Sequence, residues 1–379
     1  MDAFTTPLPK TWQKVRLGDI LTLKHGRDYK NFKLGNIPVY GSGGYMLSIN
    51  NFLHNGESVC IGRKGTIDKP IYLNGKFWVV DTLFYSYSFK KSIPKFIFYA
   101  FSIIKWSNYN EATGVPSLTK MTISNIEIPL PPLNEQIAIA NVLSDVDRYL
   151  CSLDALILKK ESVKKALSFE LLSQRKRLKG FNQAWQKVRL GTYKYRRGSF
   201  PQPYGNPQWY SDNGMPFVQV YDVGENFKLT QKTKQKISKI AQPMSVFVPK
   251  NSVIITLQET IGRVALTQYD CYCDRTILIF DNNTLNDVNK YFFVLSLFTK
   301  FEEEKRKADG SIIKTITKQT LKDFEIPLPP LDEQAAIANI LSGLDSEIIS
   351  LKNKKRQFEN VKKALNHDLM SAKIRVLNK

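Results

Sequence analysis

The chain has 379 residues, 42% of them hydrophobic, and carries 55 Lys and Arg against 34 Asp and Glu, a formal net charge of +21. This length and composition predict two to three domains with ordinary hydrophobic cores and exclude a largely disordered chain. The positive charge favours a polyanionic partner. Nucleic acid is a better candidate than an anionic membrane, because neither terminus carries a basic amphipathic anchor.

No targeting or metal-binding signal is visible in the sequence. The longest apolar runs are far shorter than the ~20 residues that cross a bilayer, and the opening MDAFTTPLPKTW is not a secretory signal. The four cysteines lack zinc spacing and are expected to be reduced thiols. We therefore expect a cytoplasmic protein with no metal site and no membrane partner.

The sequence contains an internal duplication. WQKVRLG at 12–18 recurs at 185–191, and IPLPPLNEQIAIANVLS at 128–144 recurs as IPLPPLDEQAAIANILS at 326–342. The interval between these two segments differs between the halves, so the ends are alike and the interiors differ. The predicted regions are a first globular domain at 1–127, a proline-rich exit and long helix at 128–180, a second globular domain at 181–325, and a second exit and helix at 326–379.

Both globular regions are rich in short strand-like runs. Residues 37–90 contain β-branched and aromatic runs separated by Gly, Asn and Pro, and residues 216–280 repeat this pattern. Each region also has a helical stretch, near 94–106 and near 287–306. The pattern predicts two α+β domains, each with a curved, mostly antiparallel sheet.

Glycine-bearing loops are the candidate contact sites within these domains. GSGG at 41–44 and IGRKGTI at 61–67 match neither a P-loop nor a dinucleotide fingerprint. Their backbone NH groups could instead contact a phosphate or a base edge, although a plain hairpin turn is an equal alternative for GSGG. ETIGR at 259–263 aligns with GTIDK at 65–69. The candidate DNA-contacting residues are Ser42, Gly43, Tyr45, Arg63, Lys64, Thr66, Lys120, Gln219, Tyr221, Glu259, Thr260, Arg263, Lys314 and Lys318.

Each proline-rich exit leads into a heptad repeat. The prolines of IPLPPL fit neither a helix interior nor a central strand, and Asn134 and Asp332 are expected to cap the helices that follow. Apolar residues then recur with heptad spacing, with lysines at some of the same positions. We predict two long helices that pack antiparallel as a coiled coil about a pseudo-two-fold axis, with the seam lysines extending toward solvent. The alternative is that each helix packs only on its own domain.

Residues for catalysis are missing from the sequence. The three histidines are scattered, and there is no Asp/Asn-Pro-Pro-aromatic motif for methyl transfer to a base amine. We therefore predict no catalytic residue.

The two IPLPPL-[ND]-EQ segments, the WQKVRLG openings and the ETIGR loop make the whole chain resemble the specificity subunit of a type I restriction–modification system. The resemblance implies two target recognition domains that each read half of a split double-stranded DNA site. It also implies that the helices dock two modification subunits, joined by restriction subunits. S-adenosylmethionine, ATP and Mg²⁺ are then expected on those partners, with no cofactor on this chain. The candidate partner-binding residues are Glu135, Gln136, Asn141, Glu333, Gln334 and Asn339.

Because the domain interiors differ, we expect an asymmetric bipartite target. GTIDK departs from the family's usual GTIG-type loop, which weakens the transfer of loop roles to the first domain. Two other hypotheses remain, a stand-alone DNA endonuclease with an unrecognised active site and a coiled-coil adaptor that binds only protein. The adaptor hypothesis leaves the positive charge unexplained.

Overall fold

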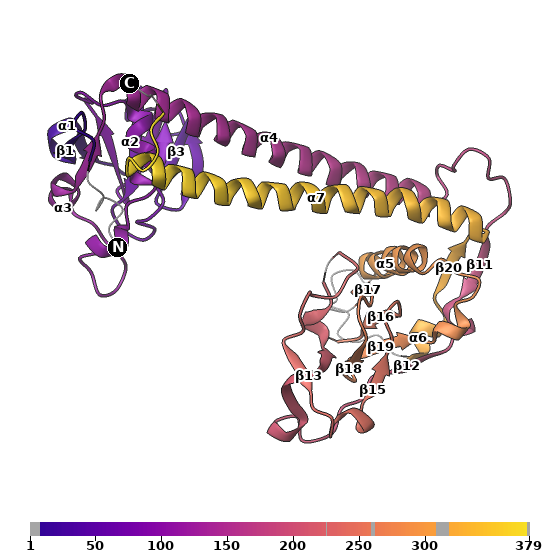
Figure 1. Ribbon diagram of the computed structural model, residues 1–379. Helices are drawn as coiled ribbons and strands as arrows, with labels where there is room; N and C mark the ends of the chain where they lie inside the picture. Colours follow the sequence, from indigo (N-terminus) through magenta and orange to yellow (C-terminus); the bar gives the residue numbers. More distant parts are fainter. Residues whose placement is uncertain (1–7, 225, 259–261, 308–317, 377–379) are drawn as a thin grey trace. The chain divides into compact units, whose positions relative to one another are not determined.

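The computed structural model describes residues 8–224, 226–258, 262–307 and 318–376 (Figure 1). The chain divides into two compact units, unit 1 with Met1–Leu156 and Leu351–Lys379, and unit 2 with Ile157–Ser350. Each unit combines one β-rich domain with parts of both long helices. The predicted α+β class is confirmed, whereas the predicted boundaries at 127, 180 and 325 stay a prediction, because the long helices are shared between the units.

Unit 1 contains three sheets. Its strands are β1 (Gln13–Arg16), β2 (Thr22–His25), β3 (Leu34–Gly41), β4 (Gly44–Ile49), β5 (His54–Asn55), β6 (Ser58–Gly62), β7 (Ile71–Leu73), β8 (Lys76–Val79), β9 (Leu83–Tyr87) and β10 (Glu127–Leu130). Its short helices are α1 (Leu17–Ile20), α2 (Pro94–Phe101) and α3 (Lys120–Asn125). The strand orders are β1-β10, β2-β9-β6-β7 and β4-β3-β8-β5.

Unit 2 repeats this topology. Its strands are β11 (Gln186–Arg189), β12 (Tyr195–Arg197), β13 (Tyr210–Val218), β14 (Gln235–Ile237), β15 (Val246–Val248), β16 (Val253–Thr256), β17 (Val264–Leu266), β18 (Cys271–Cys273), β19 (Ile277–Phe280) and β20 (Glu325–Leu328). The domain helices are α5 (Lys290–Lys307) and α6 (Lys318–Lys322). The strand orders β11-β20, β12-β19-β16-β17 and β14-β13-β18-β15 match those of unit 1 one for one. The interiors have therefore diverged in sequence and not in topology.

Most strand pairs are antiparallel, as predicted. The named strands pair in parallel only at β3 with β8 and at β13 with β18, within the described residues. The prediction of one curved sheet per domain is wrong, because each domain has two four-stranded sheets. The chain passes from one to the other in a short turn, Val80–Thr82 in unit 1 and Asp274–Thr276 in unit 2.

The long helices are α4 (Leu133–Leu172) and α7 (Leu331–Met370). They begin at the leucine before Asn134 and Asp332, so these two residues lie in the first turn and are not N-caps. The backbone NH groups of Gln136 and Gln334 donate to the carbonyls of Pro132 and Pro330, both at 3.0 Å, and start the helical ladder. The preceding Pro129 is tolerated in β10 because β10 has only one neighbouring strand, β1.

The two long helices pack antiparallel in each unit (Figure 1). In unit 1, Lys355 Nζ lies 2.7 Å from Asp154 Oδ1, and the ring centroids of Tyr149 and Phe358 are 4.7 Å apart. In unit 2, Lys160 Nζ lies 2.5 Å from Glu347 Oε2. The predicted heptad seam is confirmed. Its lysines, however, form ion pairs across the seam and do not simply extend into solvent.

Both helices also reach the core of each domain. The core of unit 1 includes Leu143 from α4 together with Leu369 and Met370 from α7. In the core of unit 2, Leu341 from α7 meets Leu171 from α4. The alternative that each helix packs only on its own domain is therefore wrong.

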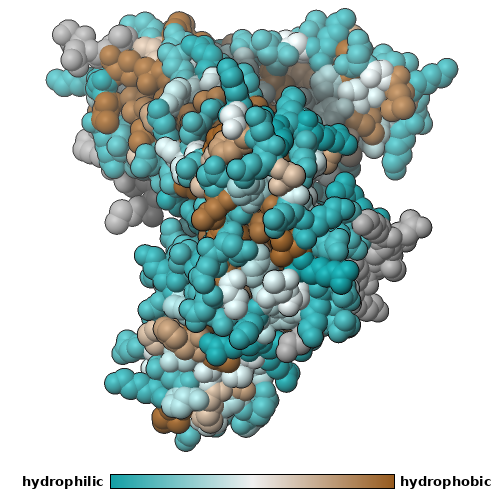
Figure 2. All heavy atoms as spheres, turned by 90° about the vertical axis from the view of Figure 1, so that its right-hand side faces the viewer, coloured by the Kyte–Doolittle hydropathy of each residue, from teal (hydrophilic) through white to brown (hydrophobic). Residues whose placement is uncertain are grey.

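The face of the molecule shown in Figure 2 is mainly hydrophilic. On the face shown in Figure 2, brown hydrophobic residues form separate patches among teal ones. Within the described part of the chain, no helix has the length and apolarity that a membrane span requires.

Candidate nucleic-acid interface

Two loops of unit 1 bond to the β8–β9 turn, and a third loop bonds to one of them. The Thr82 carbonyl accepts hydrogen bonds from the backbone NH of Arg63 at 2.7 Å and of Lys64 at 3.3 Å. The Thr82 hydroxyl accepts from the Ser42 NH at 3.3 Å. The Gly65 NH in turn donates to the Pro116 carbonyl at 2.9 Å, which brings in the loop before α3. Residues up to 74 positions apart in the sequence, from Ser42 to Pro116, thus form one surface, which we call the unit 1 loop cluster.

Most of the predicted contact residues of unit 1 lie in or beside this cluster. Lys64 and Lys120 are exposed, and Gly43 is exposed at the hairpin tip. Tyr45 is 62% exposed, and its hydroxyl lies 3.1 Å from Ser48 Oγ. Arg63 is half-buried because its Nη1 donates to the Asp81 carbonyl at 3.2 Å, and Thr66 is also half-buried. These side chains therefore stay predicted DNA contacts.

The corresponding loops of unit 2 also converge. Arg263 Nη1 donates to the Val223 carbonyl at 3.2 Å, which joins the β16–β17 loop to the β13–β14 connection that carries Gln219 and Tyr221. Asp222 is 1% exposed and accepts from the NH groups of Gln219 and Lys234, both at 3.0 Å. Burial raises the pKa of Asp222, while these hydrogen bonds oppose the rise. Asp222 thus holds the two ends of the connection together.

Four predicted DNA-contacting residues of unit 2 lie outside the described residues or at their edge. Glu259, Thr260 and Lys314 lie outside the described residues. Lys318 begins α6, at the position that Lys120 has in α3.

Strand registers confirm the alignment of ETIGR with GTIDK. Cys60 pairs with Ile71 in unit 1 and Ile254 with Ala265 in unit 2, so both arms of the hairpin share an offset of 194. Under this offset Arg263 corresponds to Lys69, and Arg63 corresponds to Leu257. The two arginines are therefore not equivalent, although their loops are.

The structure adds basic residues that the sequence-based analysis missed. The loop after β2 carries the exposed Arg27, Lys30 and Lys33 beside the β8–β9 turn. It is anchored where the Arg27 NH donates to the Val79 carbonyl at 2.9 Å and Trp78 Nε1 donates to the Arg27 carbonyl at 2.7 Å. In the sequence, these residues lie in the run GRDYKNFK, where basic and aromatic residues alternate, a pattern that could have indicated a nucleic-acid contact.

Four of the six predicted partner-binding residues are buried and bonded inside the chain. Glu135 and Glu333 are 2% and 1% exposed, and Gln136 and Gln334 are 0% and 1% exposed. Gln136 Nε2 donates to two carbonyls of unit 1 while its Oε1 accepts a backbone NH, and Gln334 does the same in unit 2. Their position supports a structural role and leaves no side-chain surface for a partner.

The two buried glutamates form equivalent clamps. Glu135 accepts from Trp12 Nε1 at 3.0 Å and pairs with Arg375, which follows α7. Glu333 accepts from Trp185 Nε1 at 3.0 Å and pairs with Arg177, which follows α4. Each clamp connects the first residues of a domain and the start of one long helix to the segment that follows the other long helix.

The remaining two partner candidates are exposed. Asn141 and Asn339 lie in the early turns of α4 and α7. On α4, Leu133 and Ile137 stand two turns and one turn before Asn141 and are 49% and 47% exposed. On α7, Leu331 is 51% exposed two turns before Asn339. The start of α4 therefore presents two exposed apolar residues before an exposed amide, and the start of α7 presents one.

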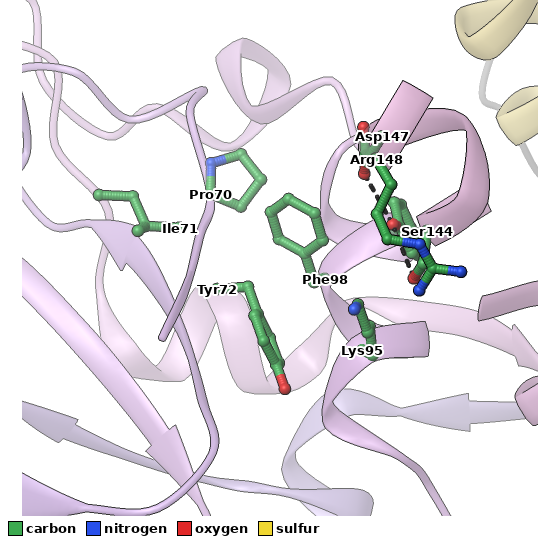
Figure 3. A pocket seen from close by; sticks show the side chains of 9 residues that line it. Pro70, Ile71, Tyr72, Lys95, Phe98, Ser144, Asp147 and Arg148 are labelled. Atoms are coloured by element: carbon green, nitrogen blue, oxygen red, sulfur yellow. Dashed lines mark hydrogen bonds between the residues drawn. The ribbon is translucent and has the colours of Figure 1, made fainter. Parts of the chain in front are cut away.

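A hollow of about 400 Å³ lies in unit 1 between β7, α2 and α4 (Figure 3). Phe98 and Tyr72 face it, with ring centroids 6.1 Å apart. Among the described residues that line it, Asp147 is the one carboxylate, and it is engaged by the Tyr99 hydroxyl at 2.7 Å and by Lys362. The hollow therefore offers no free acidic pair for hydrolysis. Within the described residues, no group of His, Cys, Asp and Glu could hold a metal ion.

Both units carry excess positive charge. Unit 1 has 26 Lys and Arg against 14 Asp and Glu, and unit 2 has 29 against 20. Two topologically equivalent basic domains, each with converging loops of different composition, define a class of protein with two nucleic-acid-recognition domains.

Comparison with known proteins identifies the family. The family model of the type I restriction modification DNA specificity domain matches residues 9–164 and 202–360. The chain therefore belongs to this family: it is a DNA-recognising specificity subunit of a type I restriction–modification system and is not itself an enzyme. The stand-alone endonuclease hypothesis is not favoured.

Individual relatives agree over most of the chain. The type I restriction enzyme MjaVIII specificity subunit of Methanocaldococcus jannaschii is 25% identical over 425 residues, covering 98% of this chain and 95% of that protein. The putative MjaX specificity subunit of the same organism is 28% identical over 299 residues, covering 75% and 68%. The type I restriction–modification S subunit structure from M. genitalium has the same fold, with a TM-score of 0.67, 14% identity, and 97% and 98% coverage.

Proposed function

We propose that this chain recognises an asymmetric, bipartite site on double-stranded DNA, one half with each β-rich domain, and docks two modification subunits on its long helices. The observation that carries the proposal is that equivalent loops converge in both units with different residues at equivalent positions. Two domains that have the same fold but different residues at the contact positions are expected to recognise two different half-sites.

The number of modification subunits is inferred from the duplicated helix starts. Asn141 and Asn339 occupy equivalent exposed positions, each with an exposed leucine two turns before it. Two equivalent surfaces are suited to two copies of one partner, one for each unit. In this proposal S-adenosylmethionine, ATP and Mg²⁺ belong to the modification and restriction subunits, and the complex works in the cytoplasm.

A site-selection experiment tests the bipartite target. The full chain is assembled with its methyltransferase subunits and used to select from a duplex DNA pool with a long randomised segment. We expect a motif of two different half-sites separated by a fixed number of unspecified base pairs. A single uninterrupted motif, or a perfect palindrome, would contradict the proposal.

The loop clusters are tested by separate alanine substitutions. Arg63→Ala and Arg263→Ala should each weaken binding by about 1–3 kcal/mol if the arginine contacts a base. Lys64→Ala should weaken binding to all sequences and reduce the slope of log K against log salt by about 1, as loss of a phosphate contact does. Fluorescence anisotropy at several salt concentrations measures both effects. Lys159→Ala, an exposed lysine on α4, is the matched control, and wild-type affinity and slope in all three loop variants would show that these loops are only turns.

A further inference from the structure

The β8–β9 turn of unit 1 and the β18–β19 turn of unit 2 have the same backbone geometry. The NH of Val80 donates to the Tyr40 carbonyl at 2.9 Å, and the NH of Asp274 donates to the Val218 carbonyl at 3.0 Å. Thr82 accepts from the first residue of the β6–β7 loop, as Thr276 accepts from the first residue of the β16–β17 loop. The strands that flank the turns, β8 and β9 in unit 1 and β18 and β19 in unit 2, share the offset of 194, and each pair of flanking strands has equivalent neighbours, β3 and β6 in unit 1 and β13 and β16 in unit 2.

A glycine packs against each turn in the same way. A Cβ on Gly26 would lie 2.0 Å from the Val80 carbonyl oxygen, and one on Gly198 would lie 2.3 Å from that of Asp274. The equivalence therefore extends to the backbone that supports the turns. Residues at the middle of the two turns can be compared directly.

The middle residue is Asp81 in unit 1 and Arg275 in unit 2, and both are exposed. Asp81 stands beside Arg63, whose guanidinium bonds to the Asp81 carbonyl and leaves the carboxylate out of that contact. Arg275 lies over the Tyr204 ring, with its guanidinium carbon 5.3 Å from the centroid. The two turns have the same backbone geometry, but their middle residues, Asp81 and Arg275, carry opposite charges.

The turn is also central in the unit 1 loop cluster, because Thr82 bonds to Ser42, Arg63 and Lys64. A carboxylate at this place is repelled by phosphates and can be accommodated against DNA only where it meets a hydrogen-bond donor. The base edges supply one, because Asp accepts from cytosine N4, whereas Arg pairs with guanine O6 and N7.

We propose that Asp81 and Arg275 are equivalent base-reading residues, Asp81 selecting a cytosine in one half-site and Arg275 a guanine in the other. The inference rests on the proposed function and deepens it, because it places one cause of the asymmetry between the half-sites at a single position. Neither residue was among the contact residues predicted from the sequence.

Two amide substitutions test the assignment in the full chain assembled with its methyltransferase subunits. Asn and Gln pair with adenine N6 and N7. Asp81→Asn should therefore shift one position of one half-site from cytosine to adenine, and Arg275→Gln should shift one position of the other half-site from guanine to adenine. The expected change in discrimination is roughly 5- to 150-fold, which corresponds to about 1–3 kcal/mol. The Arg63 bond to the Asp81 carbonyl does not depend on the carboxylate and is kept in Asp81→Asn.

The controls repeat each chemical change away from the turns. Asp19→Asn changes an exposed residue of α1, and Arg189→Gln changes an exposed residue of β11. Both should select the wild-type motif from the randomised duplex pool. Thermal melting of all four variants shows whether the fold is kept.

The outcomes separate this inference from the function on which it rests. If the wild-type complex enriches a bipartite motif and both amide variants enrich the same motif, the inference is wrong and the proposed function stands. A uniform loss of affinity without a change of base preference would also overturn it, because that is the behaviour of a phosphate contact. If the wild-type complex enriches no motif, both fail.

Discussion

Replacing Glu333 with alanine is expected to destabilise unit 2 by about 3 kcal/mol. The carboxylate is 1% exposed and accepts from Trp185 Nε1 at 3.0 Å and from Arg177 Nε and Nη2 at 3.1 and 2.6 Å. Its removal leaves the Arg177 guanidinium, whose side chain is 28% exposed, without its anion and an indole NH without an acceptor. Since both donors remain in place, their desolvation is no longer compensated.

Urea unfolding followed by circular dichroism measures this loss, and hydrogen exchange of peptides covering β11 and β20 locates it. Glu333→Gln keeps a carbonyl oxygen for one donor and should lose less than Glu333→Ala. The matched control is Glu325→Ala, which removes an exposed carboxylate 3.2 Å from Arg189 Nε and should cost at most about 1 kcal/mol. Equal midpoints for Glu333→Ala and Glu325→Ala would rule out a stabilising clamp.

The second large effect is expected for Gly198→Ala, at about 3 kcal/mol or more, because overpacking against backbone is hard to relieve. The added Cβ would lie 2.2 Å from the Cys273 carbonyl oxygen and 2.3 Å from that of Asp274. The Gly198 NH also donates to the Ile277 carbonyl at 2.9 Å, so the segment cannot move away without losing this bond. The strain therefore falls on the β18–β19 turn that carries Arg275, and DNA selectivity should weaken in one half-site.

Gly205→Ala is the control in the same segment, since no atom lies within 4 Å of its added Cβ. That variant should unfold at the wild-type midpoint or slightly above it, because alanine restricts the unfolded chain. Thermal melting and site selection measure both variants. A wild-type midpoint for Gly198→Ala would show that the close approach of the two backbones is not needed for the fold.

Features encoded over short distances could be predicted from the sequence. Heptad spacing after each proline-rich exit predicted the two long helices, because a seam of period 3.5 needs a partner helix along its whole length. β-branched and aromatic runs separated by Gly, Asn and Pro predicted the strand-rich regions 37–90 and 216–280, and the mostly antiparallel pairing is confirmed. The predicted N-caps, Asn134 and Asp332, lie inside the helices, because Leu133 and Leu331 are already helical. The helices therefore begin directly after the prolines.

Repetition alone does not separate partner contacts from internal contacts. Glu135, Gln136, Glu333 and Gln334 recur in the sequence because each unit needs the same internal clamp, and all four are buried. A repeated residue is required twice, and the sequence alone does not say whether the requirement is internal packing or an outside partner. Asn141 and Asn339 recur equally and are exposed.

The duplication, the two β-rich domains, the paired helices and the preference for nucleic acid were determined by the sequence itself, since each depends on composition or on a pattern within a few dozen residues. Only the tertiary structure decided which side chains meet. Trp12, Glu135 and Arg375 span almost the whole chain, and the β8–β9 turn becomes the centre of a loop cluster only through the registers of β3, β6, β8 and β9. Such contacts follow from strand pairing and burial across long separations, and no local pattern at Asp81 or Arg275 marks them as equivalent.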